Sequence, residues 1–163
     1  MQTKKTISAR RSRSQGGSVI VEFALSFFLI FWTFSGLFEF GYVYYAYNNI
    51  VNAVRNGARY ASNLPYSSTT TTPDSTYSTN VTNMVVYGTA SPANGAQPVV
   101  SGLATSNVSI TMTSGGTGTL SAPTAVTLSV TGFSLNAVFG TISISSFPKI
   151  TFPYTGILTP PSS

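Results

Sequence analysis

One carboxylate stands inside an otherwise apolar stretch near the N-terminus of this 163-residue chain. Residues 19–38 contain a single ionisable side chain, that of Glu22. A charge within an apolar run of bilayer length costs at least ~2.5 kcal/mol on insertion scales, and such residues usually have a partner inside the membrane. We therefore expect a cation to neutralise Glu22. The alternatives are that its carboxylate snorkels to the membrane edge or takes up a proton.

The remaining titratable residues are too few for the common catalytic arrangements. The chain contains three acidic residues, no His and no Cys. Paired carboxylates are therefore not available, a serine nucleophile has no His base, and the commonest metal ligand is missing. We predict that the protein is not an enzyme and that it uses no cofactor, no metal and no small-molecule substrate.

Residues 19–38 are long enough for one transmembrane helix, since about 20 residues rising ~1.5 Å each cross the hydrocarbon. A cleavable secretory signal is the alternative, but its apolar core would be only ~7–15 residues long and would end at small residues. The cations that account for the net charge of +5 all precede the run, and they are Lys4, Lys5, Arg10, Arg11 and Arg13. Basic residues beside a membrane helix stay cytoplasmic, so we expect the N-terminus inside and the rest of the chain outside. Nucleic-acid binding needs a basic face on a folded domain, and we therefore expect no nucleic-acid partner.

Apolar residues continue at helical spacing beyond this run. The stripe consists of Val43, Tyr47, Ile50, Val51, Val54, Ala58 and Ala61. Asn and Arg fill the other side, which predicts one helix over residues 18–63, half in lipid and half amphipathic, ending before Pro65. Gly41 and Gly57 are its weak points. Each either permits a kink or allows close packing against a neighbour.

The residues after this helix change character twice. Small polar residues dominate 64–83 and predict a Ser/Thr-rich flexible linker. Alternation of apolar and polar residues then predicts β-strands in residues 84–163. The clear strand segments are 108–113, 126–130 and 142–144, the weaker ones are 84–87, 98–100 and 149–152, and 114–123 is a hairpin connection. The predicted fold class is α+β, with a long transmembrane and amphipathic helix followed by a small antiparallel β domain that packs on the helix.

The start of the apolar run resembles the cleavage signal of type IV prepilins, which a membrane peptidase cuts after a Gly. Cleavage between Gly17 and Ser18 would place Glu22 at the fifth mature position, followed by Phe23. More narrowly, GGSVIVEFAL and FEFGYVYYAYNNIVNAVRNGARYAS within residues 16–62 resemble the TadE-like family of tight-adherence pilus proteins. The residues that match the later motifs of this family are Glu39, Gly41, Gly57, Ala58 and Arg59.

This resemblance implies a minor pilin or pseudopilin that takes part in assembling a type IV-like pilus for attachment or secretion. Its partners would be membrane lipid, a prepilin peptidase, other pilins and the assembly machinery. It would be a single-pass protein of the bacterial inner membrane, with residues 1–17 as a cytoplasmic leader and 84–163 outside the cytoplasm. Cleavage would create an amine on Ser18, only ~6 Å of helix rise from Glu22. The amine of a neighbouring subunit would then pair with Glu22, and a subunit docked at the wrong height would leave a charge unpaired at ~3–5 kcal/mol.

A second hypothesis needs no processing. In it the chain is a permanently anchored single-pass envelope protein whose β domain binds a partner. A mature protein beginning at Ser18 would distinguish the first hypothesis from the second.

Overall fold

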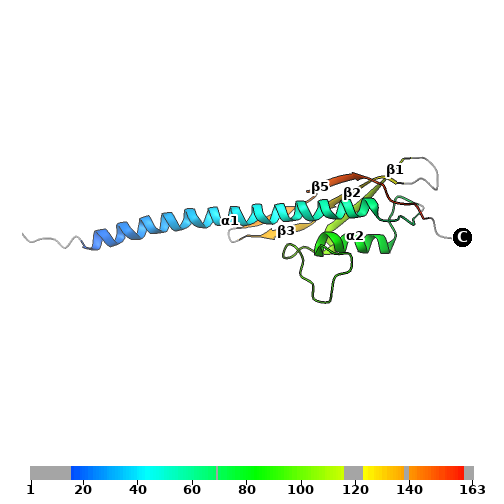
Figure 1. Ribbon diagram of the computed structural model, residues 1–163. Helices are drawn as coiled ribbons and strands as arrows, with labels where there is room; N and C mark the ends of the chain where they lie inside the picture. The colour runs from blue at the N-terminus through cyan, green and yellow to red at the C-terminus, as the bar shows by residue number, and fades with distance from the viewer. Residues whose placement is uncertain (1–15, 69, 116–122, 138–139, 160–163) are drawn as a thin grey trace, which may run out of the picture. The chain divides into compact units, whose positions relative to one another are not determined.

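The computed structural model describes residues 16–68, 70–115, 123–137 and 140–159 (Figure 1). Its helices are α1 (Gly16–Asn63), α2 (Ser75–Tyr87) and the short 3-10 helix η1 (Thr105–Asn107), and its strands are β1 (Val108–Ser114), β2 (Pro123–Val130), β3 (Phe133–Asn136), β4 (Thr141–Ile144) and β5 (Lys149–Pro153). The predicted α+β class is confirmed. The chain divides into two compact units, residues 1–38 and 39–163. The basic residues of the expected leader, and residues 116–122 of the expected hairpin connection, lie outside the described residues.

Helix α1 ends at Asn63, as predicted, because Pro65 disfavours helical geometry at the residue before it. Its buried face after residue 39 consists of Ala46, Ile50, Ala53, Val54, Ala58 and Ala61. This face is displaced from the predicted stripe. Tyr47 is 39 % exposed and Val51 is half-buried, whereas two alanines outside the prediction are buried. Small side chains at these positions let other elements approach the helix backbone closely.

Helix α2 corrects the prediction of a flexible linker over 64–83 and of a strand at 84–87. Asp74 is its N-cap and accepts a hydrogen bond from the backbone N–H of Tyr77 (2.7 Å). Gly88 ends the helix with a φ of 74°, a conformation that glycine adopts without strain. Tyr77, Val81 and Val85 recur every four residues and are buried, so tertiary burial overrides the β-branched and Ser/Thr-rich composition of the segment. The strand expected at 98–100 is also absent, and Val99 there donates a single backbone hydrogen bond to Val86.

The strands form two antiparallel sheets within the described residues. One has the order β1-β2-β5, and the other pairs β3 with β4. The alternation at 108–113, 126–130, 142–144 and 149–152 correctly predicted β1, β2, β4 and β5. Strand β3 was missed, although Phe133 and Leu135 alternate with polar residues in it. β1 and β2 are antiparallel neighbours whose pairing extends to Ser114 and Pro123, and most of the connection between them lies outside the described residues.

The hydrophobic core joins the sheets to both helices. Val126, Leu128 and Val130 project from one side of β2, and all three are fully buried. They belong to one cluster with the buried face of α1 and the apolar residues of α2. The sheet therefore packs on the amphipathic half of α1, as a sheet of this size requires.

Candidate functional site

The expected processing site lies in the first turns of α1. A Cβ placed on Gly17 would meet nothing within 4 Å, and Ser18 is exposed. No described side chain therefore shields the bond between them. Cleavage at this bond stays a prediction.

Glu22 and Phe23 follow one turn later, and both side chains are exposed. The side chains around them are exposed as well, and they are among the most apolar in the chain. α1 is the one described helix that is long and apolar enough to cross a membrane. Glu22 forms no ion pair with another described residue, and its exposed side chain is accessible to a group from outside the chain.

The apolar part of α1 has two different faces. Small or hydroxyl side chains recur at helical spacing on the face of Glu22, where Leu25 and Leu29 also lie, and they are Ser18, Ser26, Thr33 and Gly36. Thr33 satisfies its hydroxyl by donating to Leu29 O (2.8 Å), as a hydroxyl in lipid must. The other sides carry aromatic rings, including a stack of Phe23, Phe27 and Phe31 with centroids 6.2 and 6.3 Å apart. Small residues on one face let transmembrane helices pack closely, whereas large rings suit lipid.

This small-residue face was missed in the sequence. The spacing of four, four, seven and three residues that connects Ser18, Glu22, Ser26, Thr33 and Gly36 was the signal that could have found it. Run length and mean hydropathy do not reveal this face, because neither depends on which side of the helix a residue lies.

The later motif residues do not gather into one site. Glu39 is half-buried, and a Cβ on Gly41 would meet nothing within 4 Å. Ala58 is fully buried in the core, whereas Arg59 on the next position is exposed. These residues therefore lie in different surroundings along the helix and not in one site.

Gly57 is a point of close approach between elements. A Cβ placed there would overlap Val85 Cγ2 of α2 and would lie 3.3 Å from Leu128 Cδ2 of β2. The glycine thus lets α2 and the sheet pack against the backbone of α1. Of the two interpretations of the glycines, close packing holds for Gly57, with a neighbour inside the same chain. Gly41 has no such neighbour in the described residues.

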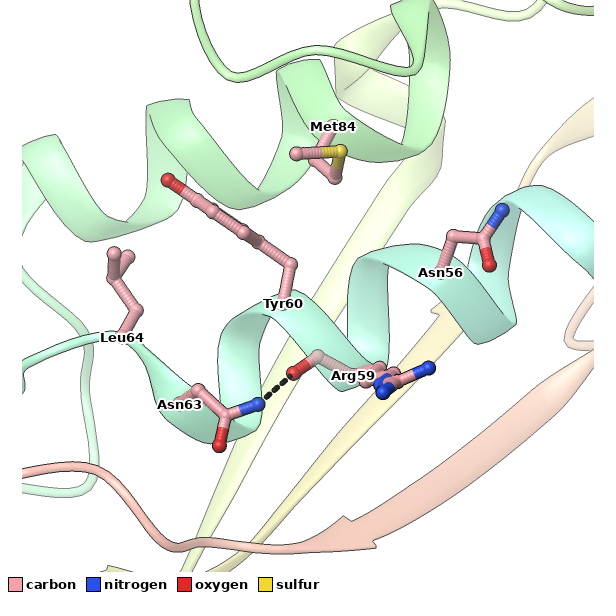
Figure 2. Close-up of a pocket in the computed structure, with 6 residues that line it drawn as sticks. All are labelled: Asn56, Arg59, Tyr60, Asn63, Leu64 and Met84. Carbon is pink, nitrogen blue, oxygen red and sulfur yellow. Dashed lines mark hydrogen bonds between the residues drawn. The ribbon is translucent and has the colours of Figure 1, made fainter.

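Arg59 lines an open groove between α1 and α2 (Figure 2). The groove has a volume of about 330 Å³ and is lined by Asn56, Arg59, Tyr60, Asn63, Leu64 and Met84. A second hollow of about 350 Å³ shares Asn56 and Met84 with it and extends past Asn52 and Asn49. The lining of the first groove consists of two amides, two apolar side chains, the phenol of Tyr60 and one guanidinium, with no carboxylate among them. Such a lining offers hydrogen bonds but no nucleophile and general base.

The described residues also contain no group of three His, Cys, Asp or Glu side chains that could hold a metal ion. Three buried or half-buried tyrosines form the clearest titratable cluster in them. The ring of Tyr66 meets that of Tyr77 edge to face at 5.5 Å and that of Tyr154 at 6.2 Å. Burial raises the pKa of each of these phenols, so all three stay neutral and donate hydrogen bonds.

The tyrosines satisfy backbone carbonyls at the C-terminal end of α1. Tyr77 donates its hydroxyl to Ala61 O (2.6 Å), and Tyr154 donates to Leu64 O (2.7 Å). Thr155 adds a backbone hydrogen bond to Ser62 O (2.8 Å). The last four carbonyls of any helix lack intrahelical partners, so these contacts stabilise the end of α1. Tyr154 and Thr155, which directly follow β5, therefore hold the chain at the C-terminal end of the helix.

The fold and the site together define a class of protein. It has one N-terminal helix that is long and apolar enough to cross a membrane, and this helix continues into a small α+β unit. The family model described as TadE-like protein matches residues 17–59, so this segment of the chain is similar to that family. The matched segment runs from the expected cleavage glycine, Gly17, to Arg59, and it includes every motif residue named in the resemblance. Comparisons with curated proteins and with solved structures find no match.

Proposed function

We propose that this chain is a minor pilin or pseudopilin that takes part in assembling a tight-adherence, type IV-like pilus. It is a single-pass protein of the bacterial inner membrane, with its N-terminus in the cytoplasm and residues 39–163 outside. Its role is structural and not enzymatic. The TadE-like match over residues 17–59 is the observation that carries the proposal.

The two-faced helix supports a role in assembly. The small-residue face of α1, which consists of Ser18, Glu22, Ser26, Thr33 and Gly36, can pack closely against a helix of another pilin. Glu22 lies in this face with an exposed carboxylate and no ion pair among the described residues. A neighbouring subunit would then dock at the height along the helix where its cation pairs with Glu22. At any other height Glu22 would stay unpaired in a medium of low dielectric.

Processing supplies that cation. Cleavage after Gly17 by a prepilin peptidase would free the amine of Ser18, which lies on the same face as Glu22 and ~6 Å away along the helix. In a single chain the Ser18 amine lies close to Glu22 of the same helix. In an assembly, a neighbouring subunit that is shifted along the helix axis would present its Ser18 amine to this Glu22 instead. Attachment to a surface or secretion would be the task of the finished pilus.

The decisive experiment compares Gly17→Ala with Gly36→Ala in a host that has the peptidase. Both changes add one methyl to α1 at a position where nothing lies within 4 Å, so their effects on folding are matched. We expect mass spectrometry to find a mature chain beginning at Ser18 in the wild type and in Gly36→Ala, and an intact N-terminus in Gly17→Ala. Both variants should still be found in the membrane fraction.

An unprocessed wild-type chain would refute the proposal. It would favour the alternative, a permanently anchored envelope protein whose β domain binds a partner. Normal maturation of Gly17→Ala would show that the cleavage site lies elsewhere.

A further inference from the structure

Asparagine side chains form a line along the face of α1 that borders α2. Asn49, Asn52 and Asn56 follow one another at spacings of three and four residues, so they lie on one face of the helix. All three line the second hollow, which adjoins the groove beside Arg59. We call the two hollows together the amide groove. All of its lining residues belong to the unit of residues 39–163.

No contact among the described residues accounts for these three amides. Their side chains form no hydrogen bond with another described residue. Asparagine is also one of the poorer helix formers, because its amide competes for backbone groups, and it is favoured at caps and turns. Other asparagines of the fold bond to backbone carbonyls or to a side chain, and they are Asn48, Asn63, Asn83, Asn107 and Asn136. A local preference that is broken without an internal gain is expected at a functional site.

The two sides of the amide groove differ in chemistry. Relative to Asn56, Tyr60 is turned ~40° around the helix toward α2, and Arg59 is turned ~60° the other way. Figure 2 shows Tyr60 pointing from α1 toward α2. The α2 side also carries Met84, which is half-buried, and Val99, which is 42 % exposed. Arg59 is exposed, and its guanidinium forms no ion pair with another described residue.

An extended peptide fits this arrangement. Each asparagine amide offers a donor and an acceptor, which match the N–H and C=O groups of a peptide backbone. From Asn49 to Asn56 the helix rises ~10.5 Å, which is about the length of three extended residues. Side chains of an extended chain alternate between its two sides. Apolar side chains would then face Met84 and Val99, and acidic ones would face Arg59, since a carboxylate pairs with a guanidinium.

A second copy of this chain does not supply such a peptide. The chain has three acidic residues, and none of them lies in an extended segment that could enter the groove. Glu22 and Glu39 are part of α1, and the carboxylate of Asp74 caps α2. The complementary acidic side chains therefore belong to another protein.

We infer that the amide groove binds an extended peptide of another protein, in which acidic residues alternate with apolar ones. The three amides bond to its backbone, Arg59 pairs with an acidic side chain, and the α2 side contacts the apolar ones. This binding goes beyond the proposed function and does not depend on it. The groove lies outside the expected membrane span and needs no cleavage at Ser18.

Panning of a phage-displayed library of short random peptides on the full chain in detergent micelles tests the inference. Empty micelles remove the phage that bind detergent. We expect the enriched sequences to alternate Asp or Glu with apolar residues. The most enriched peptide, labelled with fluorescein, then gives a dissociation constant by fluorescence polarisation. No enrichment over empty micelles would overturn the inference.

Matched variants locate the bound peptide. Arg59→Gln should weaken binding about tenfold or more and remove most of its dependence on salt, because a charge-assisted hydrogen bond is lost. Asn52→Ala should weaken binding about threefold or more, since one neutral hydrogen bond is lost. The controls are Arg55→Gln and Asn48→Ala, which change the same residue types on α1 outside the lining of the groove. Each control should change the dissociation constant by about twofold at most.

Three results would overturn the site. Equal losses in Arg59→Gln and Arg55→Gln would show that net charge alone attracts the peptide. Unchanged binding in both Arg59→Gln and Asn52→Ala would place the peptide elsewhere on the chain. On an array of neutral and acidic oligosaccharides, a sugar whose binding requires Arg59 would favour a carbohydrate ligand if no peptide is enriched. A chain that is not cleaved at Ser18 would refute the proposed function and leave each of these outcomes as it is.

Discussion

Gly57→Ala tests whether this motif glycine exists to allow close packing. The new methyl would overlap Val85 Cγ2 and would lie 3.3 Å from Leu128 Cδ2. Val85 cannot turn away easily, because a valine in a helix has one strongly preferred rotamer. Overpacking a core by a methylene typically costs ~1–3 kcal/mol, whereas replacing glycine by alanine in a helix gains ~1 kcal/mol. We therefore expect a net loss of up to ~2 kcal/mol in the free energy of unfolding.

The matched control is Gly41→Ala, where the added methyl meets nothing within 4 Å. It should leave stability unchanged or raise it by up to ~1 kcal/mol. Urea denaturation of the full chain in detergent micelles would measure both, followed by the near-ultraviolet circular dichroism of the buried tyrosines. Trp32 lies in the span and is not a suitable probe of this unit.

A double variant sharpens the result. In Gly57→Ala with Val85→Ala, the methyl at 57 enters space that the valine has vacated. The loss of unfolding free energy in the double variant should therefore be smaller than the sum of the losses in the two single variants, by ~0.5–3 kcal/mol. If Gly57→Ala unfolds at the same urea concentration as Gly41→Ala and the double variant is additive, the contact at Gly57 does not exist. The assignment of this motif glycine to close packing would then be wrong.

Three further predictions concern the membrane and the tyrosine cluster. Glu22→Val should leave membrane anchoring unharmed and reduce co-purification of other pilins, with unchanged recovery of those partners as the contrary result. Tyr77→Phe removes the donor to Ala61 O and should cost ~1–2 kcal/mol by urea denaturation. Burial raises the pKa of Tyr77 above its ordinary 10.0, so its contribution to stability is complete below pH 10.0 and declines as pH rises from there toward the raised folded pKa. A wild-type midpoint that does not fall above pH 10.0, or that falls equally in Tyr77→Phe, would contradict this. Asp74 has a pKa lowered by hydrogen bonds from Ser67 and from the Tyr77 backbone, so its contribution is complete above the ordinary 3.8 and is lost as pH falls through the lower folded pKa. Asp74→Ala should cost ~0.5–2 kcal/mol at neutral pH and flatten this acid dependence, and an unchanged acid midpoint would count against the N-cap.

Much of the candidate site could be predicted from local patterns. Glu22 was evident because one carboxylate in a long apolar run is costly whatever surrounds it. The expected cleavage residues, Gly17 and Ser18, followed from their spacing to it. The face that Glu22 shares with Ser26 and Thr33 was also present in the sequence, but it becomes clear only when the run is followed as a helix. The groove beside Arg59 could not be predicted, since Met84 comes to it from α2.

The sequence alone determined the membrane-length helix, its end before Pro65 and four of the five described strands. Each of these depends on neighbours along the chain: run length, the restriction before proline, or alternation with a period of two. Tertiary structure decided which side of α1 is buried, that Ser75–Tyr87 forms a helix, and that Tyr77 donates a hydrogen bond to Ala61 O in the last turn of α1. These features depend on residues far apart in sequence. Their burial outweighs local propensity, and no short sequence pattern indicates which distant residues will meet.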